Sequence, residues 1–151
     1  MSHKHLLFVA IAFLLVSCST KKTTYRTKTD REQLGISSMF IEGFQYEMLE
    51  QFDEAAEIYK EIIAFDKTHS ASRYHLARIL MQQRNYTDAI RLAKEIIIIE
   101  PQNQWYQLLL AELYDKTGNI KSKIDIFKKL IENEPQNTQL YFELANAYLS
   151  I

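Results

Sequence analysis

Residues 101–137 read PQNQWYQLLLAELYDKTGNIKSKIDIFKKLIENEPQN. The triplet Pro-Gln-Asn opens this stretch and also closes it. The two prolines, Pro101 and Pro135, lie 34 positions apart. Between them, apolar residues recur at helical spacing on both sides of a polar turn at Gly118-Asn119, which predicts a pair of helices. Each proline ends the second helix of a pair, because proline lacks an N–H group and disfavours helix in the residue before it.

The 34-residue period extends over residues 36–151. Small residues repeat at one position of the register and large ones three positions later: Gly43, Ala77, Ala111 and Ala145, and Tyr46, Leu80, Tyr114 and Tyr148. A period of this size is typical of stacked helical repeats, in which neighbouring units bury each other's apolar faces. The register divides the chain into units 36–69, 70–103 and 104–137 and a partial unit 138–151.

Composition supports an all-α fold. The 151 residues contain 47% apolar residues but only three glycines and two prolines, which excludes a turn-rich all-β protein. The single cysteine excludes a disulfide framework. Residues 36–151 carry 12 basic and 17 acidic side chains, a net charge of −5 that disfavours nucleic-acid binding. We expect first helices over 36–49, 70–83, 104–116 and 138–151, and second helices over 52–66, 86–100 and 120–133.

The pattern resembles the tetratricopeptide repeat (TPR), which implies a right-handed α-solenoid of three full repeats plus one further helix. The small register residues stand where that family brings helices close together. Ala55 and Ala89 match its small residue in the second helix, and Tyr59 and Phe127 match its later aromatic. Four positions depart from the pattern: Glu42, Lys67, Ala93 and Lys123.

The resemblance also implies a concave groove, lined by the first helices, that binds a protein or peptide partner. The register assigns nine residues to this groove: Phe40, Phe44, Tyr74, Arg78, Trp105, Leu108, Glu112, Phe142 and Asn146. Aromatic and arginine side chains are frequent interface anchors, and an apolar lining suits a helix-in-groove mode. An aromatic residue at this spacing can also belong to the core between units. Phe40 and Phe44 stand where clamp residues for acidic chaperone tails would begin, which disfavours that mode.

The N-terminus has the pattern of a signal peptide over residues 1–17. Lys4 is followed by an apolar run over residues 6–16, which is shorter than the roughly 20 residues that span a bilayer. The run ends in Leu15-Val16-Ser17-Cys18, which resembles the lipobox of bacterial lipoproteins. The resemblance implies that Cys18 becomes the first residue and carries palmitate-type acyl chains. Two or three such chains anchor a protein stably in a membrane.

Residues 18–35 are predicted to form the lipidated cysteine and a flexible basic tether. Ser19, rather than aspartate, follows Cys18. In lipoproteins of this kind that favours the outer membrane, and the lysines at 21 and 22 favour its periplasmic side. The whole chain resembles the N-terminal part of multi-repeat envelope lipoproteins of Bacteroidota.

We find no catalytic constellation, and we expect no cofactor and no metal. His69 and His75 are six residues apart, which is not the spacing of a helical zinc pair. The predicted function is therefore a membrane-anchored scaffold or adaptor for protein–protein interaction in the bacterial envelope, serving secretion or outer-membrane assembly. One alternative is the N-terminal adaptor region of a longer envelope enzyme. Another is a barrel-assembly lipoprotein, against which the strict period counts.

The last predicted helix is unusually apolar. Nine of the twelve residues over 140–151 are apolar, whereas a terminal helix of a repeat array needs a polar outer face. We therefore expect this helix to pair with further repeats or with another chain.

Overall fold

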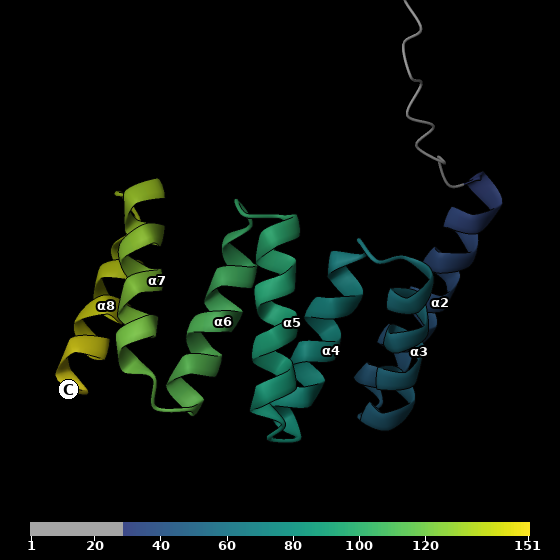
Figure 1. Cartoon of the computed structure of the whole chain (residues 1–151), viewed down its shortest axis with the longest axis horizontal. Helices are drawn as coiled ribbons and strands as arrows, with labels where there is room; N and C mark the ends of the chain where they lie inside the picture. The colour runs from purple at the N-terminus through teal and green to yellow at the C-terminus, as the bar shows by residue number, and fades with distance from the viewer. Residues whose placement is uncertain (1–28) are drawn as a thin grey trace, which may run out of the picture.

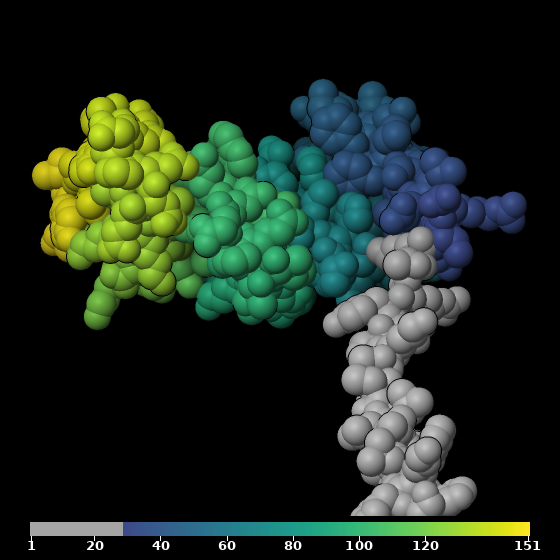
Figure 2. Space-filling view, turned by 90° about the horizontal axis from the view of Figure 1, so that it is seen from above, coloured from purple at the N-terminus to yellow at the C-terminus, as the bar shows by residue number. Residues whose placement is uncertain are grey.

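A computed structural model describes residues 29–151, and the described residues form seven α-helices in one row (Figure 1). The helices are α2 (Asp30–Met48), α3 (Phe52–Phe65), α4 (Ser70–Gln82), α5 (Tyr86–Ile99), α6 (Gln104–Lys116), α7 (Ile120–Asn133) and α8 (Thr138–Leu149). Each helix packs against the next one along the chain, and α4 also contacts α6. Figure 2 shows the resulting elongated body, whose repeats follow one another from one end to the other. The all-α solenoid predicted from the period is confirmed.

The first helix begins earlier than predicted. The predicted start was residue 36, with the flexible tether reaching residue 35, but α2 begins at Asp30. Thr29 and Glu32 form a capping box, in which the Glu32 N–H donates to Thr29 Oγ1 at 3.3 Å and the Thr29 N–H donates to Glu32 Oε2 at 2.9 Å. The prediction that residues 30–35 belong to a tether was therefore wrong. Cys18 and the rest of the predicted signal peptide and tether lie outside the described residues.

The turns inside the repeats follow the same period. The N–H groups of Gln51, Asn85 and Asn119 donate to carbonyl oxygens five residues earlier, at 2.9, 2.8 and 2.8 Å. This closure requires a left-handed residue just before each donor. Gly118 supplies it in the third unit with φ of 71°, whereas Glu50 and Arg84 adopt φ of 59° and 61°. A left-handed backbone costs a non-glycine residue about 1–2 kcal/mol.

Close approach of the paired helices explains the small residues of the register. Ala77 and Ala111 are buried. A Cβ atom on Gly43 would lie 3.0 Å from Tyr59 Cε1, so the large Tyr59 ring of α3 takes the space that an alanine would need. In the first unit, the fully buried Tyr59 ring therefore packs directly against the backbone of Gly43.

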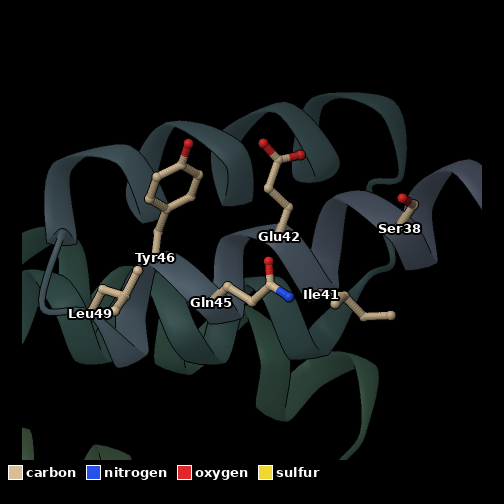
Figure 3. A pocket seen from close by; sticks show the side chains of 6 residues that line it. All are labelled: Ser38, Ile41, Glu42, Gln45, Tyr46 and Leu49. Carbon is tan, nitrogen blue, oxygen red and sulfur yellow. The ribbon is translucent and has the colours of Figure 1, made fainter.

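Two departures from the repeat pattern have structural reasons. Leu76 and Leu110 are buried, but Glu42 at the same register position lies on a face of α2 that no described helix covers. Figure 3 shows this face, where Glu42 and Tyr46 project side by side over a shallow depression of about 590 Å³. Lys123, in place of a small residue, donates from Nζ to Asp115 Oδ1 at 2.6 Å and is only 13% exposed in its side chain.

Helix α8 leaves large apolar side chains exposed. Ala145 is exposed although its register equivalents are buried, and so are Tyr141, Tyr148 and Leu149. These residues lie on the side of α8 that corresponds, in the earlier first helices, to the side packed against the second helix of the same repeat. Pairing of α8 with further repeats or another chain stays a prediction.

Candidate functional site on the first-helix face

The face formed by register positions two, five and nine of the first helices is called the first-helix face here. These positions lie on one side of an α-helix, because they are three and four residues apart. They contain the nine residues predicted for the groove, which come from α2, α4, α6 and α8. The direct contact between α4 and α6 places first helices of neighbouring units side by side.

Aromatic rings connect α2, α4 and α6 below this face. His75 of α4 lies at the centre, with the Phe40 and Phe44 rings of α2 packed edge-on at centroid distances of 5.4 and 5.7 Å. Tyr74 packs edge-on against His75 at 5.5 Å and tilts against Tyr106 of α6 at 5.6 Å. The first three repeats are therefore joined by a continuous aromatic contact rather than by aliphatic packing alone.

A polar cluster lies beside these rings. Glu47 Oε2 accepts a hydrogen bond from the Tyr59 hydroxyl at 3.0 Å and lies 2.7 Å from His75 Nδ1. Glu47 Oε1 is 3.8 Å from Arg78 Nη1. The side chains of Glu47 and His75 are only 13% and 15% exposed. The carboxylate thus ties together side chains of α2, α3 and α4.

The pKa values of this cluster follow from burial and from the partners of Glu47. Burial raises the pKa of the Glu47 carboxyl, but the hydrogen bond and charge of His75, the Tyr59 hydroxyl and Arg78 together outweigh it. The net result is a Glu47 pKa below its ordinary value of 4.5, so the group is ionised at neutral pH. Burial and the neighbouring Glu47 charge raise the pKa of the Tyr59 hydroxyl, which keeps it a donor.

The structure divides the nine predicted residues into two groups. Phe40, Tyr74, Leu108 and Asn146 are half-buried, and the first three pack against the core. Phe44, Trp105 and Phe142 are 43%, 63% and 60% exposed. Arg78 and Glu112 also reach solvent: the Arg78 side chain is 42% exposed and its guanidinium lies 5.8 Å over the Tyr74 ring.

The sequence left open whether each aromatic residue of this face belongs to the core between repeats or to a binding surface, and the exposure of the side chains separates these two roles. Tyr74 contributes mainly to the contact between repeats, whereas Trp105 projects from the start of α6. The cap Asn103 holds that helix start, because its Oδ1 accepts from the Trp105 N–H at 3.2 Å.

Sequence reasoning missed the hydrogen bonds around Glu47 and, although it included Arg78, it missed the cations Arg84 and Lys116 near the carboxyl-terminal ends of α4 and α6. Glu47 and His75 are 28 positions apart in the chain, so no local spacing connects them. His69 caps α4 by accepting the Ser72 N–H at Nδ1. Within residues 29–151 no group of three or more His, Cys, Asp or Glu side chains could hold a metal ion. None of the helices in that range is long and apolar enough to cross a membrane.

Residues 48–97 and 80–122 match the model of the tetratricopeptide repeat family. The matched residues run from the end of α2 to the start of α7, and the described helices have the tetratricopeptide-repeat fold. No curated protein sequence matches the chain.

Solved structures of other repeat proteins share this fold. The first TPR domain of Spaghetti (RPAP3), bound to the HSP90 peptide SRMEEVD, has a TM-score of 0.69 at 13% identity, covering 76% of this chain and 91% of that chain. MamA has a TM-score of 0.69 at 19% identity, covering 78% and 69%. A tetratricopeptide repeat protein from Parabacteroides merdae has a TM-score of 0.66 at 23% identity, covering 76% of this chain and 45% of its own. At these identities the likeness shows the fold alone.

Proposed function

We propose that this chain is a membrane-anchored adaptor of the bacterial envelope that holds a segment of a partner protein against its first-helix face. The observation that carries the proposal is the exposure of three large apolar side chains on this face, each from a different repeat: Phe44, Trp105 and Phe142. Large apolar side chains that share one face normally mark an interaction surface. Neighbouring TPR structures that hold an HSP90 or an HSP70 peptide support this use of the fold.

The site is a surface for binding rather than for reaction. Glu47 and His75 are largely buried and hydrogen-bonded to each other, and Glu47 also accepts a hydrogen bond from the Tyr59 hydroxyl. A buried carboxylate with its partners in place stabilises the contact between repeats. We therefore propose a non-catalytic role in secretion or outer-membrane assembly, with the adaptor region of a longer envelope enzyme as the alternative.

Co-purification from envelope extract tests the binding part of the proposal. The full chain in mild detergent serves as bait beside the variant Phe44→Ala/Trp105→Ala. A matched control, Phe65→Ala/Ile98→Ala, removes comparably exposed apolar side chains from second helices. A genuine partner is retained by the wild-type chain and the control and is lost from the first-helix variant. Partners retained equally by all three baits contradict the proposal.

The anchoring part rests on the lipobox-like residues before Cys18, and Cys18→Ala tests it. Because the thiol is the only one in the chain, the variant is expected to incorporate no labelled palmitate. Without two or three acyl chains it should leave the membrane fraction or accumulate as precursor. The measurement is palmitate labelling with membrane fractionation. If Cys18→Ala is still acylated and membrane-bound, the lipoprotein assignment is wrong.

A further inference from the structure

A polar pocket lies at one rim of the first-helix face, at the carboxyl-terminal ends of α4 and α6. This rim pocket has a volume of about 450 Å³. Three cations and one carboxylate line this pocket: Arg78, Arg84, Lys116 and Glu112. The rest of the lining is Met81, Gln82 and Tyr86. The excess of positive charge stands out, because residues 36–151 have a net charge of −5.

Two of these cations are available to a ligand. Arg84 and Lys116 are exposed and form no ion pair with any other residue of 29–151. Arg78 is held in place, because its guanidinium lies over Tyr74 and 3.8 Å from Glu47. Glu47 and the Tyr74 ring therefore orient Arg78, whereas Arg84 and Lys116 at the rim have no ion-pair partner among residues 29–151.

The backbone conformation of Arg84 is unfavourable for a residue other than glycine. Arg84 has the left-handed backbone that Gly118 adopts 34 residues later, at φ of 61°. An arginine at this turn places a charge at the pocket that glycine would not supply.

The rim pocket lies along the same helix as the exposed tryptophan. Lys116 follows Trp105 by eleven residues on α6, which corresponds to about 16 Å along the helix axis. Glu112 follows Trp105 by seven residues, or about 10 Å. An extended peptide covers these distances in about three to five residues at roughly 3.3 Å each.

We infer that the partner segment carries an aspartate or glutamate three to five residues from the apolar side chain that meets Trp105, and that this carboxylate binds Arg84, Lys116 and Arg78 in the rim pocket. The inference rests on the proposed function and adds the chemistry of the partner. Paired and bidentate carboxylate recognition suits arginine in particular. An acidic segment with apolar neighbours matches both parts of the face, whereas a polyanion such as nucleic acid would meet the net negative charge of the array.

A random twelve-residue peptide library, selected on the full chain in mild detergent, tests the inference. The rim variant is Arg84→Gly/Lys116→Gln, and its matched control is Glu50→Gly/Lys129→Gln. Both variants place glycine at an equivalent left-handed turn position, so neither disturbs the backbone, and thermal melting monitors the fold. We expect the wild-type chain to select peptides with an acidic residue three to five positions from an aromatic or aliphatic one.

A selected peptide is then measured by fluorescence anisotropy. Its affinity should fall at least tenfold when its acidic residue is changed to the amide, and at least tenfold on the rim variant. It should change less than twofold on the control. Peptides without an acidic preference, or acidic peptides that bind the rim variant equally well, overturn the inference and leave the proposed function intact. A library that yields no binder, or binders insensitive to Phe44→Ala/Trp105→Ala, overturns both.

Discussion

Replacing Phe44 and Trp105 together by alanine is expected to weaken binding of the chain's partner by about 30-fold or more. An aromatic anchor contributes about 2 kcal/mol or more at an interface, which corresponds to a factor of about 30, so this loss is expected even if only one of the two side chains acts as an anchor. Truncation of Trp105, which is 63% exposed, costs the free chain little stability, and truncation of Phe44, which is 43% exposed, also removes its ring contact with His75. Isothermal titration of the purified partner, or of a library-selected peptide, into the full chain measures the dissociation constant.

Two measurements separate lost contacts from lost fold. The helical circular-dichroism signal of the double variant should match that of the wild type, and its melting temperature should fall only slightly, by the loss of the contact between Phe44 and His75. The control Phe65→Ala/Ile98→Ala, on second helices, should bind within a factor of two of the wild type. An affinity loss that is equal in both variants would show that exposed apolar residues act non-specifically rather than as anchors of the first-helix face.

Tyr59→Ala is expected to lower the free energy of unfolding by about 3–5 kcal/mol. The ring is fully buried against Gly43 and Phe40, and truncation of a large aromatic core residue leaves a cavity of this cost. The change also removes the hydroxyl that donates to Glu47. A domain stabilised by about 5–15 kcal/mol would lose a large part of its stability. Urea denaturation followed by circular dichroism measures the change.

Tyr59→Phe separates the ring from its hydroxyl. It keeps the packing and withdraws one donor from a carboxylate that is only 13% exposed, which should cost about 1–3 kcal/mol. A loss below 1 kcal/mol for Tyr59→Ala would contradict the role given to this side chain in joining α2, α3 and α4.

The helices were predictable because the 34-residue period repeats the apolar spacing of each helix and the polar turns between helices. Asn85, Asn103 and Asn119 cap their helices with side-chain oxygens, and all the helices after α2 begin at their predicted residue. The start of α2 was missed because its cap, Thr29, lies in a stretch of polar and basic residues without apolar periodicity. The spacing of Thr29 and Glu32, which is that of a capping box, was the one signal in the sequence for this helix start. A search guided by apolar periodicity does not detect it.

The candidate site was predictable only in part. The register places Tyr74 and Trp105 on one face but does not say which of them neighbouring helices cover. Tyr74 packs between His75 and Tyr106 because three helices meet there, whereas Trp105 stands at a helix start with fewer neighbours. The contacts of Glu47 with His75 and Arg78 depend on how the first two units stack, and stacking is not encoded in spacing along one helix.

Photo-crosslinking in the native cells tests the central claim, that a partner lies across the first helices, most directly. A crosslinking amino acid replaces one exposed residue at a time in the full chain. First-helix positions are Phe44, Trp105 and Phe142, and second-helix positions are Glu57, Ile98 and Lys129. The account predicts one common adduct from the first-helix positions and none of it from the second helices. The same adduct arising mainly from Glu57, Ile98 and Lys129 would contradict it.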